Sequence, residues 1–271
     1  MGGAMFKRIA LALVLSLLVA LPAIAQNLEK GGAAFKKRDY ATALKEWRPL
    51  AEQGNTAAQY YLGSIYIQGL GVTQDHAEAM KWFRKAAEQG HPGSQHNLGI
   101  YYEEGKHAPQ DYAEAKKWYR KAAEQGYSSA QYNLGYMYYK GIGVAQDYGE
   151  ALKWWRKAAE LGDARAIRNL GTMYLDGLGV TQDHGEAVKW YSKAAELGDV
   201  TAQRLIGYMY GRGFGVTRDD VVAQMWFILA AARGDKTAAR NRDKGARNLT
   251  SSQIARAQEL AQEYIEKHKK K

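Results

Sequence analysis

A glycine recurs every 36 residues in this chain, and no insertion or deletion breaks the interval. These glycines are Gly54, Gly90, Gly126, Gly162, Gly198 and Gly234. A fixed period of this length is typical of a solenoid, in which each supersecondary unit buries its apolar face against its neighbours. The period therefore predicts a single elongated array for the 271 residues, instead of one or two globular domains.

The first half of each 36-residue unit predicts a helix with one recurrent face. Ala58, Leu62, Gly63 and Tyr66 are separated by helical spacings, and the same residue types recur at 130, 134, 135 and 138. A glycine inside a helix destabilises it by about 1 kcal/mol relative to alanine. Its recurrence at the position of Gly63 indicates that the second helix of the unit crosses too closely there for a Cβ.

The second half of each unit predicts another helix, in which large aromatic residues alternate with alanines. Trp82 and Phe83 are followed by Ala86 and Ala87, and the pattern recurs in the later units. Side chains of such different size at fixed positions favour interdigitated packing between neighbouring units. The two halves together predict an all-α fold, an α/α solenoid of helix-turn-helix repeats.

The linker between the halves has the pattern G-x-G-V-x-x-D, as in Gly69, Gly71, Val72 and Asp75. We interpret the first glycine as a left-handed helix end, and the aspartate with the glutamate three residues later as a capping box. A phosphate-binding loop is excluded, since no strand precedes the pattern and it recurs along the chain. The second unit departs from it at His107, which predicts either a rebuilt loop or a local contact site.

The segments outside the repeats predict an exported protein with a cap at each end. Residues 1–25 resemble a cleaved signal peptide that would leave Gln26 first, and the expected location is periplasmic or secreted. Residues 26–53 form an incomplete N-terminal repeat and 54–234 five full repeats. Residues 235–266 predict capping helices, with Thr250 and Gln253 as a capping box. Residues 267–271 predict a frayed basic tail.

Charge is concentrated at the C-terminal end. Residues 233–271 hold 11 basic and 5 acidic residues, whereas 26–232 hold 25 basic and 23 acidic. This end has two interpretations, a contact with an anionic envelope surface or a solvated run of charge. Nucleic acid is not an expected partner of an exported protein.

The repeat pattern A-x-x-x-L-G-x-x-Y-x-x-G-x-G-V-x-x-D-x-x-x-A-x-x-W resembles the Sel-one-like repeat, a relative of the tetratricopeptide repeat. The resemblance covers residues 54–234 and, more weakly, about 28–265. It implies a right-handed α/α solenoid that acts as an adaptor in protein assemblies, and in bacteria a role in the cell envelope. Some secreted members carry a cysteine pair in each repeat, but this chain has no cysteine. The resemblance implies no particular partner.

The same resemblance implies that the first helices of the units line a concave groove. The framework positions of the units are nearly constant, while the groove positions vary, as expected of either a specific binding groove or unconstrained surface. Arg165 and Arg212 belong to these variable positions. The residues predicted to contact a partner are Tyr60, His96, Tyr132, Tyr136, Tyr139, Arg168, Arg204 and Tyr208.

The composition of the groove favours a peptide or protein ligand, because tyrosine offers large contact area with few rotors and arginine pairs with carboxylates. The alternative is a cell-wall or exopolysaccharide glycan stacked on the tyrosines. An enzyme is not expected, since none of the six histidines has metal-ligand spacing and no serine resembles a nucleophile elbow. No cofactor or metal is predicted.

Overall fold

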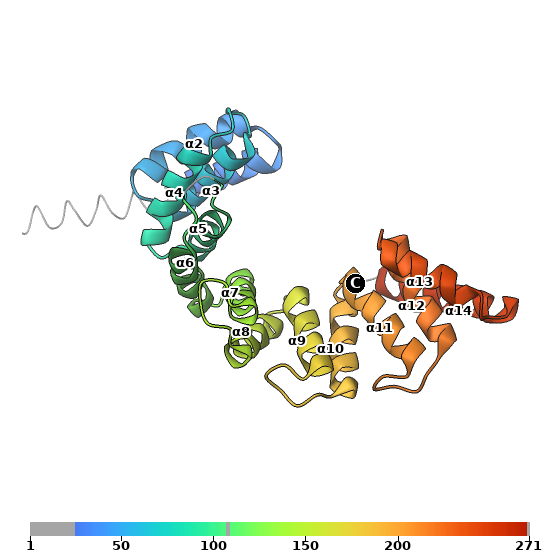
Figure 1. Cartoon of the computed structure of the whole chain (residues 1–271). Coiled ribbons are helices and arrows are strands. Elements are labelled where there is room, and N and C mark those ends of the chain that lie inside the picture. The colour runs from blue at the N-terminus through green and yellow to red at the C-terminus, as the bar shows by residue number, and fades with distance from the viewer. Residues whose placement is uncertain (1–24, 107–108, 270–271) are drawn as a thin grey trace, which may run out of the picture. The chain divides into compact units, whose positions relative to one another are not determined.

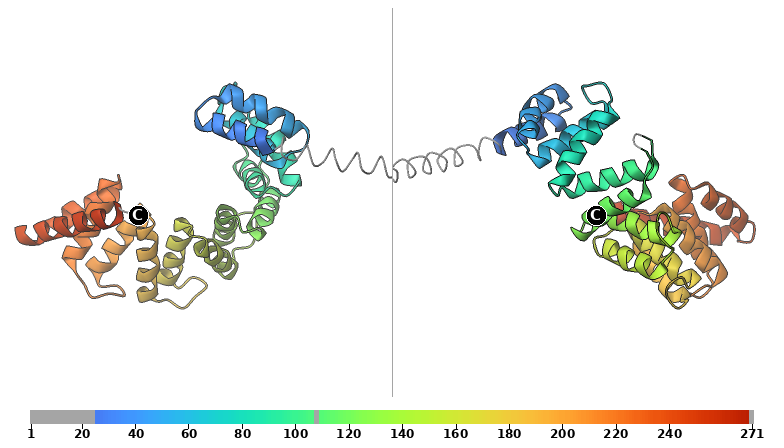
Figure 2. Two further views of the ribbon diagram at one scale, coloured as in Figure 1. Left: turned by 180° about the vertical axis from the view of Figure 1, so that it is seen from behind. Right: turned by 60° about the vertical axis from the view of Figure 1, so that its left-hand side comes forward.

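The computed structural model describes residues 25–106 and 109–269, in which helices are joined by short linkers and no strand occurs. The chain divides into two compact units, Met1–Gln125 and Gly126–Lys271 (Figure 1). Within each unit, the helices form the expected helix-turn-helix pairs (Figure 2). The prediction of an all-α solenoid of 36-residue helix pairs is thus confirmed.

Unit 1 contains an incomplete first pair followed by two full pairs. Residues 25–36 are helical and connect through residues 37–39 to the next helix, where Arg38 has a φ of 61°. The predicted signal peptide lies almost wholly outside the described residues, and so do His107 and Ala108 of the variant linker. The remaining helices of unit 1 are α2 (Tyr40–Glu52), α3 (Thr56–Gln68), α4 (His76–Glu88), α5 (Pro92–Glu104) and α6 (Tyr112–Glu124).

Unit 2 contains three full pairs and a C-terminal cap. Its helices are α7 (Ser128–Lys140), α8 (Tyr148–Glu160), α9 (Ala164–Asp176), α10 (His184–Glu196), α11 (Val200–Arg212), α12 (Asp220–Ala232), α13 (Lys236–Ala246) and α14 (Ser251–Lys269).

The linker glycines end the first helices as predicted. Gly69 follows α3 with φ 64° and ψ 35°, and its N–H donates to the Ile65 carbonyl. This left-handed conformation strains any residue with a Cβ, whereas glycine adopts it freely. A further linker contact was not predicted. Gln74 donates its side-chain N–H to the Ile67 carbonyl at 2.7 Å, which satisfies one of the free carbonyls at the helix end.

The capping-box prediction is correct for the aspartate and wrong for the glutamate. The Asp75 carboxylate accepts the Glu78 backbone N–H at 2.9 Å. The Glu78 carboxylate instead pairs with Lys81 at 3.2 Å. The Asp75 backbone N–H, which a capping box would leave to the glutamate, donates to the Tyr66 carbonyl at 3.0 Å. Because the first helix already satisfies that donor, the glutamate is free to form an ion pair on its own helix.

The recurrent glycine of each first helix is explained by an aromatic ring from the second helix. A Cβ built on Gly171 would lie 2.7 Å from the Tyr191 ring, and one on Gly63 would lie 2.6 Å from the Phe83 ring. The close approach is therefore made by a side chain and not by the second backbone. The Phe83 ring also lies 6.4 Å from the ring of Tyr101 in the next repeat. One ring thus joins its own helix pair to the following one.

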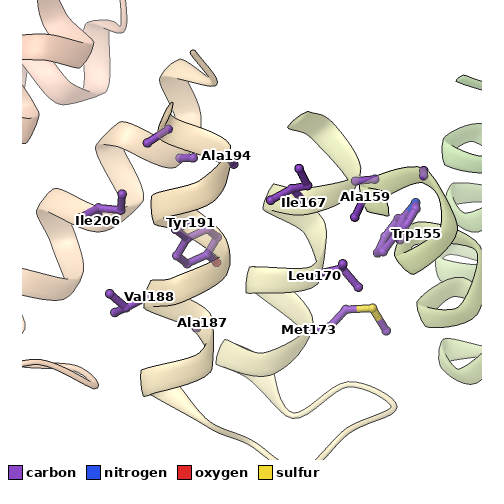
Figure 3. Packing of buried hydrophobic residues seen from close by; sticks show 14 of the residues in the cluster. Trp155, Ala159, Ile167, Leu170, Met173, Ala187, Val188, Tyr191, Ala194 and Ile206 are labelled. Atoms are coloured by element: carbon purple, nitrogen blue, oxygen red, sulfur yellow. The ribbon is translucent and has the colours of Figure 1, made fainter. Parts of the chain in front are cut away.

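The core of unit 2 is continuous along its helices. Figure 3 shows buried side chains of α8, α9, α10 and α11, among them Trp155, Leu170, Tyr191 and Ile206, which belong to one cluster. Small alanines between these large side chains let the helices approach closely. Each repeat therefore depends on its neighbours for burial, as the repeat period predicts.

The C-terminal cap covers the last repeat, and its capping box is confirmed. The Thr250 backbone N–H donates to the Gln253 side chain at 2.9 Å, and the Gln253 N–H donates to Thr250 Oγ1 at 3.3 Å. Ala257 and Ala261 of α14 pack against Met225 and Leu229 of α12. The prediction of a frayed tail is wrong up to residue 269, because the helix continues and the His268 ring stacks on Tyr264 at 4.0 Å.

Candidate partner-binding surface

Three tyrosines of α7 form an aromatic surface over the core of unit 2. The Tyr132 and Tyr136 rings stack with centroids 6.5 Å apart, and Tyr139 lies 5.2 Å from the Trp155 ring. Trp155 is fully buried, and its indole N–H donates to the Tyr132 carbonyl at 3.0 Å. The tyrosines are half-buried, so their positions are fixed from behind while part of each ring faces outward. Rigid aromatic side chains of this kind are frequent at binding hot spots.

An arginine from the next repeat completes this surface. The Arg165 guanidinium lies 4.2 Å from the Tyr132 ring centroid, a cation–π contact. It is held there by the Asp163 carboxylate at 2.6 Å and approaches the Ser129 hydroxyl at 3.4 Å. We call Tyr132, Tyr136, Tyr139 and Arg165 the tyrosine surface. It combines apolar area with a cation whose hydrogen-bond donors are partly occupied.

Electrostatics around Tyr139 favour its neutral form. Burial raises the pKa of the Tyr139 phenol, and the nearby Asp176 carboxylate raises it further. A neutral phenol can donate a hydrogen bond as well as accept one. Tyr139 therefore offers a hydroxyl donor to a ligand.

Two of the predicted contact residues are engaged in joining repeats. Arg168 pairs with Asp199 at 3.0 Å, and Arg204 pairs with Asp235 at 2.9 Å. Both carboxylates are N-caps of the first helix of the next repeat. Partial burial opposes ionisation of Asp235, but the Ala238 N–H and the Arg204 guanidinium outweigh it and lower its pKa. These arginines are partly buried and fixed, so their first role is to connect repeats.

Tyr208 is the most exposed of the predicted residues and lies apart from the tyrosine surface on α11. The Arg212 guanidinium lies 5.6 Å from its ring centroid, and the Phe214 ring meets it edge-on at 6.0 Å. Two neighbours thus contact the Tyr208 ring, which borders a cavity beside α12 and α13.

The two predicted residues of unit 1 belong to a separate surface. The Tyr60 ring lies 4.6 Å from the ring of His91, the N-cap residue of the next first helix. His96 lies 5.7 Å from the Tyr119 ring. Tyr60 thus occupies the connecting position that Arg168 and Arg204 occupy in unit 2. The predicted set of eight residues is divided between the units, and the structure brings together only the three tyrosines of α7.

The sequence analysis missed one signal, which is the residue that lies 31 positions after each connecting residue. His91 follows Tyr60, Asp199 follows Arg168 and Asp235 follows Arg204 at this interval. Matching these pairs in the sequence would have identified the arginines as connectors. The cavity beside α12 was also missed, since it is lined by Gln224 and Lys244, which lie outside the groove positions.

The structure offers no metal ligands and no span for a membrane within its described part. No group of three or more histidine, aspartate or glutamate side chains among residues 25–106 and 109–269 could hold a metal ion. Over the same residues, no helix has the length and apolar character needed to cross a membrane.

The sequence of the repeats matches one family model five times. The Sel1 repeat matches residues 56–91, 92–127, 128–163, 164–199 and 200–235. These matches cover more than half of the chain. The chain belongs to the Sel1 repeat family. The resemblance to the Sel-one-like repeat is therefore confirmed.

Solved structures of similar sequence have the same fold. A Sel1 repeat protein from Oxalobacter formigenes is 40% identical, with a TM-score of 0.73 over 78% of this chain and 86% of that one. A protective antigen of uropathogenic Escherichia coli strains, which displays an SLR fold, is 33% identical, with a TM-score of 0.59. That match covers 90% of this chain but only 61% of the antigen. No curated protein matched the chain.

Membership of the family indicates a general class of function. Sel1 repeat proteins generally mediate protein–protein interactions, and the repeat is generally a non-catalytic scaffold. The tyrosine surface and the connecting pairs are consistent with that class, because they combine a rigid framework with variable exposed side chains.

Proposed function

We propose that the chain is a non-enzymatic adaptor of the bacterial cell envelope that binds a peptide or protein partner on the groove face of its first helices. The tyrosine surface carries this proposal. Trp155 packs against the Tyr132 and Tyr139 rings, and Tyr136 stacks on Tyr132, so little side-chain entropy is lost when a partner covers them. Tyr60, His96 and Tyr208 extend the groove face within their own units, and Arg168 and Arg204 support it through their connecting pairs.

A peptide fits this surface better than a glycan. The cation of Arg165 covers one face of the Tyr132 ring, and Tyr139 is tilted by 40° against Trp155. Stacking of a sugar requires an open ring face, whereas a peptide can use ring edges, hydroxyl groups and the Arg165 guanidinium together. Binding of a cell-wall or exopolysaccharide glycan remains the alternative outcome of the test.

The test is cross-linking in cells followed by recovery of the protein from envelope extract. The variant with Tyr132, Tyr136 and Tyr139 changed to alanine is expected to lose the partner at least about tenfold, the effect of removing a hot-spot contact. The matched variant with phenylalanine at the same positions keeps the rings and should retain most of the partner. Equal recovery with the alanine variant, at unchanged helical content, would contradict the proposal.

Competition separates the two classes of ligand. Peptides derived from the captured partner should displace it, while peptidoglycan fragments and exopolysaccharide should not. Displacement by the glycans alone would replace the peptide with a glycan.

We also propose export to the periplasm, or secretion, after cleavage near Ala25. The supporting observation is the basic residues, apolar run and small residues of positions 1–25. N-terminal sequencing of the protein from a periplasmic fraction should give Gln26 first. Recovery of the full-length chain in the cytosol would contradict it. Contact of the basic C-terminal end with an anionic envelope surface remains a further proposal, to be tested by vesicle binding.

A further inference from the structure

A cavity of about 440 Å³ lies within unit 2, between α11, α12 and α13. It is bordered by cations from three segments, Arg212 of α11, Arg218 of the following linker and Lys244 of α13. The amide side chains of Gln224, Asn241 and Asn248 also line it. The cavity is large enough for several residues of a peptide and does not include any residue of the tyrosine surface.

The cavity exists because the last repeat departs from the repeat pattern at positions that face one another. Gly211 stands where Tyr139 and Leu175 stand in earlier repeats, and Gly245 stands where Met173 and Met209 fill the core. Gly211 and Gly245 both line the cavity. Side chains that occupy the equivalent space elsewhere are absent here, so the space remains open.

A third departure places a polar group inside. Gln224 occupies the position that is Leu152 in α8 and Val188 in α10, which are both buried. Its side chain is only 3% exposed, and its Oε1 has no hydrogen-bond partner. A buried amide without a partner destabilises a fold compared with an aliphatic residue of similar size. The other two repeats of unit 2 have an aliphatic residue at this position, and a ligand that supplies the missing donor would account for the amide in α12.

The charges of the cavity select the sign of that ligand. Arg218 is paired with Asp220 at 2.8 Å, whereas Arg212 and Lys244 have no such carboxylate partner in the structure's described residues. The site is therefore cationic overall. Because guanidinium binds carboxylates with paired hydrogen bonds, an anionic ligand with a carboxylate is favoured.

The aromatic residues of the site disfavour a sugar. The Tyr208 ring is covered by Arg212 and meets Phe214 edge-on. The Phe227 ring lies against Gly207, where a built Cβ would be 2.7 Å from it. Arg212 therefore competes with a pyranose for stacking on the Tyr208 ring, whereas a carboxylate-bearing peptide can bind Arg212 itself.

We propose that this cavity binds an acidic segment of a peptide, with a carboxylate between Arg212 and Lys244 and a main-chain N–H donated to Gln224 Oε1. Asn241 and Asn248 offer amide groups that can donate to and accept from the adjacent peptide bonds. The inference rests on the proposed function in one respect, since the peptide belongs to a protein partner. It adds a second contact site and specifies acidic residues in that partner.

The experiment uses the mature chain and a peptide of alternating glutamate and alanine with both ends blocked. Titration is followed by NMR, through the side-chain amide signals of Gln224, and by calorimetry. Saturable binding with a shift of the Gln224 signals is expected, and the matched peptide with glutamine in place of glutamate should bind at least about tenfold more weakly. Absence of saturable binding up to about 1 mM peptide would overturn the proposal.

Variants separate binding from stability. Arg212→Gln and Lys244→Gln are each expected to weaken binding about tenfold. Lys236→Gln removes a cation from α13 outside the cavity and should leave binding unchanged. Gln224→Leu introduces the residue that α8 has at this position, so it should raise the thermal stability and still weaken binding. Wild-type affinity in Gln224→Leu would overturn the role of this residue.

Two further arms distinguish other outcomes. An oligomer of a uronic acid that binds in place of the peptide would make the site one for acidic glycans. The triple alanine variant of the tyrosine surface should bind the acidic peptide normally. If it does so but also captures the cellular partner, the proposed groove function fails while the acidic-peptide site in the cavity stands. If instead it loses the cellular partner while the cavity variants bind the acidic peptide normally, the cavity proposal fails and the groove function stands.

Discussion

The connection between neighbouring first helices is made by uncharged rings between α3 and α5 in unit 1, and by ion pairs between α9 and α11 and between α11 and α13 in unit 2. Tyr60 packs against His91, while Arg168 and Arg204 bind Asp199 and Asp235. In each case, a side chain of one first helix reaches the N-cap residue of the next. The comparison teaches that the fold requires a contact at this point but not a particular chemistry. The two units should therefore share their response to changes in the framework and differ in their response to salt and pH.

A change in the shared framework should have the largest effect and should affect both units alike. Gly171→Ala in unit 2 and Gly63→Ala in unit 1 each place a Cβ against a buried ring. Overpacking of a core destabilises by about 1–3 kcal/mol, which exceeds the helix propensity gained from alanine. Hydrogen exchange of each unit measures the loss.

Gly32→Ala is the matched control for these variants. It lies in the helix of residues 25–36, and a Cβ there meets nothing within 4 Å. This change should stabilise by up to about 1 kcal/mol. If all three alanines stabilised the protein, the rings would not be the reason for the recurrent glycine.

Double-mutant cycles at the connecting pairs should give the next largest effect. For Arg204→Gln with Asp235→Asn, we expect a coupling of about 1 kcal/mol, since the pair is partly buried and asparagine still caps the helix. The coupling should fall as salt is raised. For Tyr60→Ala with His91→Asn, a coupling that does not depend on salt is expected. Equal salt dependence in the two cycles would remove the distinction between the units.

Acidification should have the smallest effect and should reach unit 1 first. Burial lowers the pKa of His91, whose Nδ1 accepts the Ser94 N–H at 3.1 Å and so caps α5. The stabilisation from neutral His91 is complete above its unfolded pKa of about 6.5 and is lost as pH falls toward the lower folded value. The pKa of Asp235 is also lowered, but from about 3.9, so its contribution is lost only in stronger acid.

Hydrogen exchange, corrected for the pH dependence of the intrinsic rate, tests this order. Protection at the start of α5 should fall between pH 7 and 5.5, while protection at the start of α13 should persist to about pH 4. The variants His91→Asn and Asp235→Asn keep a capping oxygen and do not titrate, so each should remove the effect in its own unit. If protection at the start of α13 were lost at a higher pH than protection at the start of α5, the roles assigned to His91 and Asp235 would be contradicted.

The periodic features of the fold were accessible from the sequence because they depend on local chemistry. The aspartate caps, the left-handed glycines and the Thr250–Gln253 capping box follow from residue type and spacing alone. Glu78 was assigned wrongly because the sequence does not show that the Tyr66 carbonyl already satisfies the donor it was expected to bind. That contact depends on how the linker folds back on the first helix.

The candidate site was accessible only in part. The tyrosines of α7 share one helical face, so their proximity follows from spacing. The pairing of Arg168 and Arg204 depends on which rotamer reaches the next repeat, and a groove position by itself does not reveal it. The cavity beside Gln224 required three separate departures from the pattern to be recognised as neighbours in space.

The last helix changes how the end of the array can open. In a linear array, terminal repeats unravel one after another, because each is held only by its neighbour. The Tyr264 hydroxyl of α14 donates to the Ala195 carbonyl at the end of α10, 69 residues earlier, while the rest of α14 lies on α12. Release of α12 therefore requires release of α14 and its link to α10. The C-terminal end is therefore expected to unfold as one cooperative unit that spans two repeats. Unfolding that starts there must break the contacts of α14 with both α10 and α12 before any single repeat separates.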